Sequence, residues 1–417
     1  MSRRTKALRR SLSIERLSGE AAGSVTDTTT LGARLRAVRR DRGLTQEELA
    51  DRAGLSRDLI AKLEQGQRHS ARLTSLILLA NALDVELSKL VGRRDQLGAD
   101  RDGGGVLALR DALLMPSLLP GLDDGLDGEP TSLPDVERAA RHACRSYWSG
   151  DFPALVATLP GLLAEARLTR AAQGNAAVYP LAMAYDLAAA VMIHLGREDL
   201  AAIGAERAIT TAYGGDDELL WAGLHATYVW VLLHQARLIE AEHLATAMAE
   251  RIEPAFSAPA QHVAVWGRLL ISAIAPAAAA GRDISEYAAL AAAGAGRLRG
   301  TVAIHNGRFG PAMVAEQETH GHTVLRQPNL ALQAARRIRP GDLQGIAYGR
   351  HLIDVAQAHL DARHRVAATE RLLEAREQSQ VWFRHQAIAR DLVETIRDEE
   401  TRPSPAVRSL ARTLDLS

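Results

Sequence analysis

Apolar residues recur at helical spacing along most of the chain after residue 30, and alternating, strand-like runs are few. The segments LGARLRAVRRDRG and LTSLILLANALDV each place leucines on one face, and two shorter periodic segments lie between them. We therefore predict five helices between Leu31 and Val91. Longer helical patterns, separated by Gly, Pro and polar residues, fill the remaining chain, so the predicted fold class is all-α.

The two short segments lie in LTQEELADRAGLSRDLIAKLEQG, from Leu44 to Gly66. Thr45 and Glu48 have the spacing of a capping box, which predicts that a helix begins here. Gly54 follows the last periodic residue and is suited to a left-handed C-terminal turn, and Ser56 is placed to cap a second helix. The pattern predicts two helices joined by a tight turn.

The second of these helices has one apolar face and one polar face. Leu59, Ile60 and Leu63 form its apolar stripe. The residues expected on or beside the exposed face are Arg57, Asp58, Ala61 and Lys62. An exposed, partly basic helix after such a turn is the arrangement that enters the major groove of DNA.

The order TQ, ELA, G, LS, I, LEQG resembles the lambda-repressor and Cro type of DNA-binding domain. The resemblance implies a set of DNA-contacting residues: Thr45, Gln46, Ser56, Arg57, Asp58, Lys62 and Arg68. It implies that Gln46, at a helix N-terminus, contacts a DNA phosphate and that Arg68 also contacts the phosphate backbone of DNA. Arg57 and Lys62 suit guanine, and Asp58 suits the cytosine amino group. Glu64 is expected to act inside the domain's own fold.

The larger part of the chain repeats loosely. LAMAYDLAAAVMIHLGREDLAAIGAERAI and LHATYVWVLLHQARLIEAEHLATAMAERI have their turns at Gly196 and Ala236. The pattern resembles tetratricopeptide repeats, which stack helix pairs into a solenoid with a concave face. Together with the first domain it resembles actinobacterial regulators of the lambda-type (XRE) family. The domain boundaries expected are 1–30 for a basic tail, 31–97 for the helix-turn-helix domain, 98–134 for a linker with a short helix, 135–400 for the repeat array and 401–417 for a C-terminal tail.

Setting the register of the repeats from their turns places five side chains on the concave side: Asp186, Trp230, Arg268, Arg350 and Gln357. They are candidates for binding a small molecule or peptide, with ordinary packing or solvated roles as the alternative. Peptide-sensing regulators with this architecture clamp the peptide backbone with asparagines. The four asparagines here, at 81, 175, 306 and 329, do not fall at these positions.

Charge and cysteine content narrow the function further. The chain has 50 basic and 50 acidic residues, but residues 1–97 hold 19 Lys and Arg against 12 Asp and Glu, a surplus of seven that suits DNA. The single cysteine, Cys144, excludes an internal disulfide and a cysteine-based zinc finger, and fits the cytoplasm. No apolar run is expected to reach membrane-spanning length.

Catalytic motifs are lacking: the sequence has no P-loop, no GxSxG elbow and no HExxH. His320 with His322, and Glu240 with His243, have ligand-like spacing but lack a second cluster, so packing or surface roles are expected. We therefore predict no enzyme, no cofactor and no metal. Two functions remain: a homodimeric regulator that binds an inverted-repeat operator and responds to a small-molecule, peptide or protein effector, or an adaptor whose array docks a partner while the first domain localises it on DNA.

Overall fold

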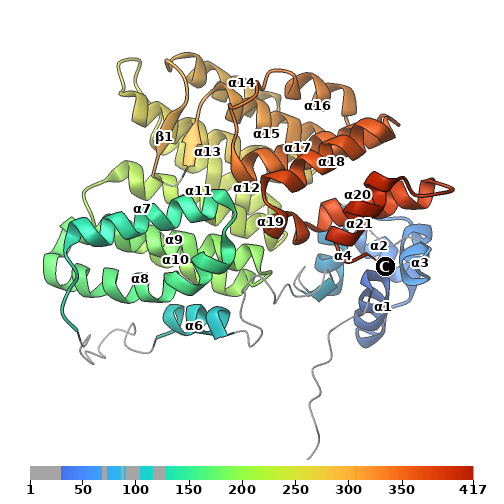
Figure 1. The fold of residues 1–417 in the computed structure, drawn as a ribbon, viewed down its shortest axis with the longest axis horizontal. Coiled ribbons are helices and arrows are strands. Elements are labelled where there is room, and N and C mark those ends of the chain that lie inside the picture. The colour runs from blue at the N-terminus through green and yellow to red at the C-terminus, as the bar shows by residue number, and fades with distance from the viewer. Residues whose placement is uncertain are drawn as a thin grey trace, which may run out of the picture.

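The computed structural model describes residues 30–67, 73–85, 89–90, 104–115, 128–305 and 307–416. These residues form an all-α structure, as predicted, apart from one two-stranded antiparallel hairpin, β1 (Val302–Ile304) and β2 (Gly307–Phe309). A small helical domain lies at one side of a large array of helices (Figure 1).

The small domain contains α1 (Leu31–Asp41), α2 (Gln46–Ala53), α3 (Arg57–Glu64) and α4 (Leu73–Leu83). The predicted capping signals are confirmed. The Thr45 hydroxyl accepts from the Glu48 amide, Gly54 has a left-handed φ of 62°, and the Ser56 hydroxyl accepts from the Leu59 amide. Most of the predicted fifth helix, and all of residues 1–29, lie outside the described residues.

Apolar side chains from all four helices form the core of this domain. Its fully buried members include Leu35, Leu49, Ile60, Leu63 and Leu79. Helix α1 approaches α3 closely because Gly32 has no side chain: a Cβ there would lie 1.8 Å from the Leu63 carbonyl oxygen. The buried face of α3 is thereby fixed, and its opposite face is left exposed.

The array begins with helices that the boundary prediction assigned in part to a linker. α6 (Gly104–Leu113) packs on α8 (Phe152–Gln173), and α7 (Leu133–Ser149) lies between them in sequence. Leu109 and Leu113 of α6 are fully buried in the core of the array. The short helix in the 98–134 segment is therefore an integral part of the array.

Five antiparallel helix pairs follow. Their helices are α9 (Val178–His194) with α10 (Glu198–Tyr213), α11 (Glu218–His234) with α12 (Leu238–Arg251), α13 (Ala260–Ala279) with α14 (Ser285–Gly296), α15 (Pro311–Val324) with α16 (Pro328–Ala335), and α17 (Gly345–Asp361) with α18 (Arg365–Gln378). The 3₁₀ helix η3 (Gly174–Ala177) leads into the first pair.

The turns of the five pairs share one backbone geometry. The residues at Gly196, Ala236, Gly281, Arg326 and Arg363 all have φ between 60° and 73°. In each turn this residue's amide bonds a carbonyl three residues earlier, and the next amide bonds a carbonyl five residues earlier. This double bond pattern is the Schellman motif. The predicted turns at Gly196 and Ala236 are confirmed, and the other three show that the repeat extends through α18.

The first helices of the five pairs, together with α7, form a closed ring. Going round it, α7, α9, α11, α13, α15 and α17 each contact the next, and α17 contacts α7 again. The closing contact requires a glycine. Gly345 has a left-handed φ of 56°, and a Cβ on it would lie 2.1 Å from the Trp148 carbonyl oxygen. The repeats were predicted to form a solenoid with a concave face, and in the structure their inner helices enclose a central space.

The C-terminal segment differs from the expected tail. After α19 (Gln380–Arg384) and α20 (Ala387–Glu399), residues 405–413 form α21 (Pro405–Thr413). Its Val407 and Leu410, and Leu414 just beyond it, are buried in the same core as α17 and α18. Apolar residues at helical spacing draw this segment onto the array, so it completes the fold.

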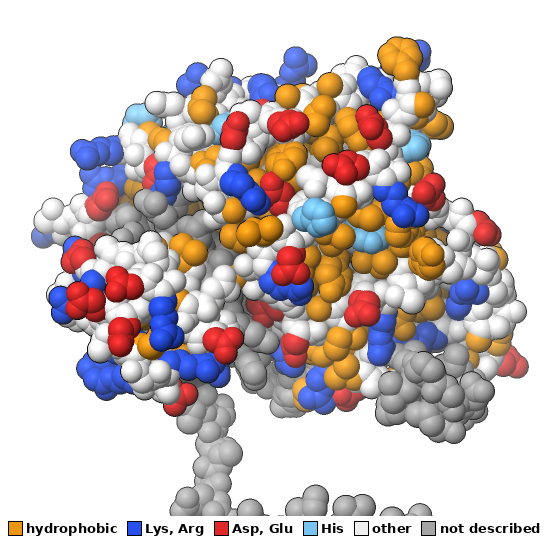
Figure 2. Space-filling model, turned by 180° about the vertical axis from the view of Figure 1, so that it is seen from behind, with side chains coloured by type: hydrophobic (Ala, Val, Ile, Leu, Met, Phe, Trp, Pro, Cys, Tyr) orange, Lys and Arg blue, Asp and Glu red, His pale blue; other side chains and the backbone are white. Residues whose placement is uncertain are grey.

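Two stretches, Phe152–His194 and Ala260–Ala279, are apolar and long enough to cross a membrane by length and composition alone. The expectation that no run reaches such a length was therefore wrong. In the structure the most apolar 18 residues of these two stretches are 89% and 67% buried, respectively, as in the core helices of a helical array. On the face of the array that Figure 2 shows, basic and acidic side chains are interspersed, with apolar side chains between them.

Candidate functional site

The exposed face of α3 carries three of the predicted DNA-contacting side chains. Arg57, Asp58 and Lys62 are all exposed, and the Lys62 ammonium lies 2.7 Å from the Asp58 carboxylate across one turn. This pair is largely solvated, so it contributes little to stability and leaves Lys62 available to another partner. Ser56 is exposed at the N-terminus of the same helix, where its hydroxyl serves as the cap.

A buried ion pair fixes α3 against α1. Arg39 donates two hydrogen bonds to the Glu64 carboxylate, at 2.6 and 2.7 Å, and a third to the Leu44 carbonyl oxygen. Burial raises the pKa of Glu64, but the hydrogen bonds from Arg39 and Gln46 outweigh this effect. The pKa of Glu64 therefore lies below its usual value. Glu64 is structural, as expected.

Two other predicted contacts have structural partners, and one lies outside the described residues. The Gln46 amide donates to Glu64 at 2.9 Å, and the Thr45 hydroxyl both caps α2 and donates to Glu48. Gln46 is therefore held against the end of α3, and Thr45 is held at the start of α2. Arg68 lies outside the described residues.

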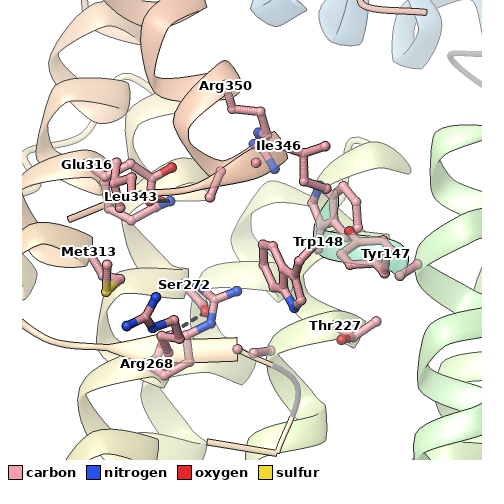
Figure 3. A pocket seen from close by; sticks show the side chains of 18 of the residues that line it. Tyr147, Trp148, Thr227, Arg268, Ser272, Met313, Glu316, Leu343, Ile346 and Arg350 are labelled. Atoms are coloured by element: carbon pink, nitrogen blue, oxygen red, sulfur yellow. Dashed lines mark hydrogen bonds between the residues drawn. The ribbon is translucent and has the colours of Figure 1, made fainter. Parts of the chain in front are cut away.

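A cavity of about 640 Å³ occupies the centre of the ring of first helices. Its lining comes from α7, α9, α11, α13, α15 and α17, with residues of the β1–β2 hairpin at one side. Figure 3 shows side chains from these separate elements converging on one space, with Arg268 and Arg350 on different sides of it. Residues far apart in sequence thus share one site.

Three of the five residues predicted on the concave side line this cavity: Trp230, Arg268 and Arg350. The other two do not. Asp186 is only 1% exposed within the helical core, and Gln357, on α17, donates to Asp361 at 2.9 Å. Arg350 and Gln357 are two turns apart on α17, and only the N-terminal part of that helix borders the cavity. The predicted register identified the inner faces of α11, α13 and α17, but it did not show how far along each helix the cavity extends.

Several cavity residues were not predicted. Tyr147 and Trp148 come from α7, Glu316 from α15 and Arg308 from the β-hairpin. Tyr147 and Trp148 share this space with α17 because α7 contacts α17, and the sequence pattern gives no sign of that closure. Only the aromatic pair at the end of α7, before Gly150, could have drawn attention in the sequence.

Three large aromatic side chains, Tyr147, Trp148 and Trp230, form part of the wall, and arginines outnumber carboxylates among the charged groups that line it. The Trp230 ring lies 5.9 Å from the Arg350 guanidinium and 5.2 Å from the His194 ring. Tyr147 packs edge-on against Trp148 with ring centroids 5.2 Å apart. Burial lowers the pKa of Arg268, the Glu316 carboxylate raises it, and the nearby charge of Arg350 lowers it again.

The other titratable groups near the cavity have structural partners or are unreactive. Desolvation opposes protonation of His320, but the Asp354 carboxylate, 3.1 Å from its Nδ1, raises its pKa above the usual value. Burial raises the pKa of Cys144 to about 12, which removes the thiolate at neutral pH. Among the described residues no group of three or more His, Cys, Asp or Glu side chains could hold a metal ion.

The small domain contacts the array at the turn after α11. Ala236 and Leu238 pack into the apolar core of the small domain, and the Asn81 amide lies 3.5 Å from the Ala236 carbonyl oxygen. α11 also supplies Thr227 and Trp230 to the cavity. One helix therefore borders the cavity with its C-terminal half and meets the small domain at the turn that ends it.

Comparison with known proteins gives matches to the first part of the chain. A family model described as Helix-turn-helix matches residues 35–90. The chain is 34% identical to an immunity repressor protein of Bacillus phage phi105 over 113 residues, which are 26% of this chain and 78% of the relative. It is 39% identical to an uncharacterized HTH-type transcriptional regulator of Sinorhizobium fredii over 66 residues, 16% of this chain and 84% of the relative.

Among solved structures, the crystal structure of Bacillus thuringiensis PlcR in complex with the peptide PapR7 and DNA aligns with 64% of this chain and 94% of its own. The sequence identity is 14% and the TM-score 0.27. So low a score gives no support for a common arrangement of the helices.

Proposed function

The chain belongs to the helix-turn-helix family of DNA-binding transcriptional regulators, and from this premise we propose that it is a sequence-specific, homodimeric regulator whose ring of helices senses an effector. In this proposal α3 reads an inverted-repeat operator in the major groove, and the cavity binds a small molecule or peptide. The protein acts in the cytoplasm, where the operator is found.

The geometry of α3 supports the reading of bases. Its buried side is fixed by Gly32 and by the Arg39–Glu64 pair, so the exposed side is presented in one orientation. Arg57 and Lys62 offer donors for the acceptors of guanine, and the solvated Asp58–Lys62 pair can exchange for base contacts at little cost. Ser56, Thr45 and Gln46 border this face and are proposed as backbone contacts.

Helix α11 supports the coupling between the effector and DNA. It carries Trp230 into the cavity, and the turn that ends it packs Ala236 into the core of the small domain. An effector that shifts α11 by a fraction of a turn would move the small domain, and hence the separation of the two reading helices in a dimer. This shared helix is the observation that carries the sensory part of the proposal.

The first experiment is selection of bound duplexes from a random library with the purified full-length protein. We expect a palindromic site with half-sites one helical turn apart and two chains bound to each site, measured by analytical ultracentrifugation of the complex. Failure to enrich any site would refute sequence-specific binding by this protein alone and would favour the adaptor, which needs its partner.

A further inference from the structure

The central cavity contains more positive than negative charge. Four arginines and two acids line it, a formal surplus of two: Arg145, Arg268, Arg308 and Arg350 against Glu316 and Asp342. The Asp342 carboxylate is already engaged, since it accepts from the Arg339 amide at 2.8 Å. Glu316 accepts from the Gln317 amide at 3.0 Å. The carboxylates keep their charge in these bonds, and the net charge of the lining residues stays positive.

Arg268 and Arg350 are the two arginines set back from solvent, whereas Arg145 and Arg308 are exposed. Within the described part of the chain, neither the Arg268 nor the Arg350 guanidinium has a hydrogen bond or ion pair, apart from the cation–π contact of Arg350 with Trp230. Each guanidinium carries five N–H donors that a folded interior normally satisfies.

The two charges also repel each other. Burial is the main cause of the lowered pKa of Arg268; the Glu316 carboxylate opposes it, and the nearby Arg350 charge lowers this pKa further. Arginine nevertheless stays protonated. Two partly desolvated cations that face one cavity are stabilised by an anion placed between them, because it supplies acceptors to both guanidinium groups.

The rest of the wall specifies the remainder of the ligand. Trp148 and Trp230 offer flat apolar surfaces, Met313 and Leu343 add aliphatic contacts, and the cavity volume of about 640 Å³ matches that of small-molecule sites. Flat rings stack on such surfaces, whereas a simple inorganic ion would leave them exposed.

We propose that the central cavity binds a small organic anion, holding its acid group between Arg268 and Arg350 and its flat apolar part against Trp148 and Trp230. This inference deepens the sensory role proposed above and rests on it for its biological meaning. Its test is direct binding to the protein without DNA, so it fails or succeeds independently of operator recognition.

The test uses three probes that share one ring system: 1-naphthylacetate, 1-naphthyl phosphate and the neutral 1-naphthylacetamide. Isothermal titration calorimetry with the full chain should show binding of at least one acid with a Kd of about 0.1 mM or tighter and at least tenfold weaker binding of the amide. The acid that binds more tightly identifies the anionic group as carboxylate or phosphate.

Two arginine variants locate the anion. Arg268→Met and Arg350→Met should each weaken binding of the preferred acid by roughly 10- to 100-fold, the effect of losing a charge-assisted hydrogen bond. Arg297→Met removes an exposed arginine at the end of α14, where it contacts the carbonyl oxygens of Ala255 and Phe256, and should leave the affinity unchanged. Thermal unfolding of each variant distinguishes lost affinity from lost structure.

A third variant should improve binding, which misfolding cannot do. Glu316→Gln removes the carboxylate that opposes an incoming anion and keeps an amide of the same shape, so the preferred acid should bind on the order of tenfold more tightly. The proposal is overturned if neither acid binds at a ligand concentration of about 1 mM, or if the amide binds as tightly as the acids. It is also overturned if the Glu316 variant binds the acid no better than the wild type while the arginine variants bind it as well as the wild type.

Discussion

Substitution of Gly345 by alanine tests whether closure of the ring holds the array together. Gly345 begins α17 at the point where this helix meets the end of α7. Its φ of 56° is unfavourable for a side chain, and the new Cβ would lie 2.1 Å from the Trp148 carbonyl oxygen. Because that oxygen belongs to the backbone, relief requires α7 and α17 to move apart.

The magnitude follows from two contributions. A non-glycine residue in the left-handed region costs about 1–2 kcal/mol, and overpacking against a fixed neighbour costs about 1–3 kcal/mol more. Gly345→Ala should therefore lower the free energy of unfolding by about 2–5 kcal/mol. Gly281→Ala is the matched control: its φ is 73° in the turn between α13 and α14, but nothing lies within 4 Å of its added Cβ, so only the first contribution applies.

Urea unfolding of both variants, followed by circular dichroism, measures the difference. Gly345→Ala should also weaken binding of the preferred naphthyl acid, because Gly345 lines the cavity, whereas Gly281→Ala should not. If the two variants unfold at the same urea concentration and bind the acid equally, the α7–α17 contact does not close the ring and the reasoning fails.

Three further predictions concern the ion pairs and the thiol. Glu64→Ala leaves the buried Arg39 cation without its partner and should destabilise the small domain by about 3–5 kcal/mol, measured by urea unfolding; an unchanged midpoint would contradict a structural role. The pKa of His320 is raised in the folded state, so the pair with Asp354 stabilises the array below about pH 6.5, and this contribution is lost as the pH rises through the folded pKa. The cost of His320→Gln should thus be larger at pH 6 than at pH 8.5 in unfolding experiments, and equal costs would refute it. Cys144 should resist iodoacetamide in the native protein at pH 8 and react in urea, as seen by mass spectrometry; rapid native alkylation would contradict its raised pKa.

The two helices and the turn between Thr45 and Glu64 could be predicted from sequence almost to the residue because their signals are local. A capping box at Thr45, a left-handed turn at Gly54 and a cap at Ser56 each depend on neighbours within four residues. The same holds for the hairpin turns at Gly196 and Ala236, where the backbone geometry is set by the turn itself. Local hydrogen bonding leaves a readable pattern in a single sequence.

The central cavity could be predicted only in part because it depends on contacts between distant segments. Periodicity identified the inner faces that carry Trp230, Arg268 and Arg350, but a helix register does not give the curvature of the stacked pairs. Closure of the ring brings Trp148 from α7 beside residues of α17, almost two hundred positions away. Gly345, which permits this approach, looks in sequence like any other glycine before a helix.

Operator affinity of purified variants, measured by fluorescence anisotropy at one stated salt concentration, tests the central claim most directly. The first double variant, Arg57→Ala with Lys62→Ala, alters the exposed face of α3. The control double variant, Arg138→Ala with Arg141→Ala, removes two exposed cations of α7 that form only surface ion pairs. The account predicts that the first pair weakens binding to the selected site by about 2–6 kcal/mol, largely abolishing its preference over random DNA, while the second pair leaves the preference intact. Equal losses for the two double variants, or an undiminished preference without Arg57 and Lys62, would contradict the assignment of α3 as the helix that reads the operator.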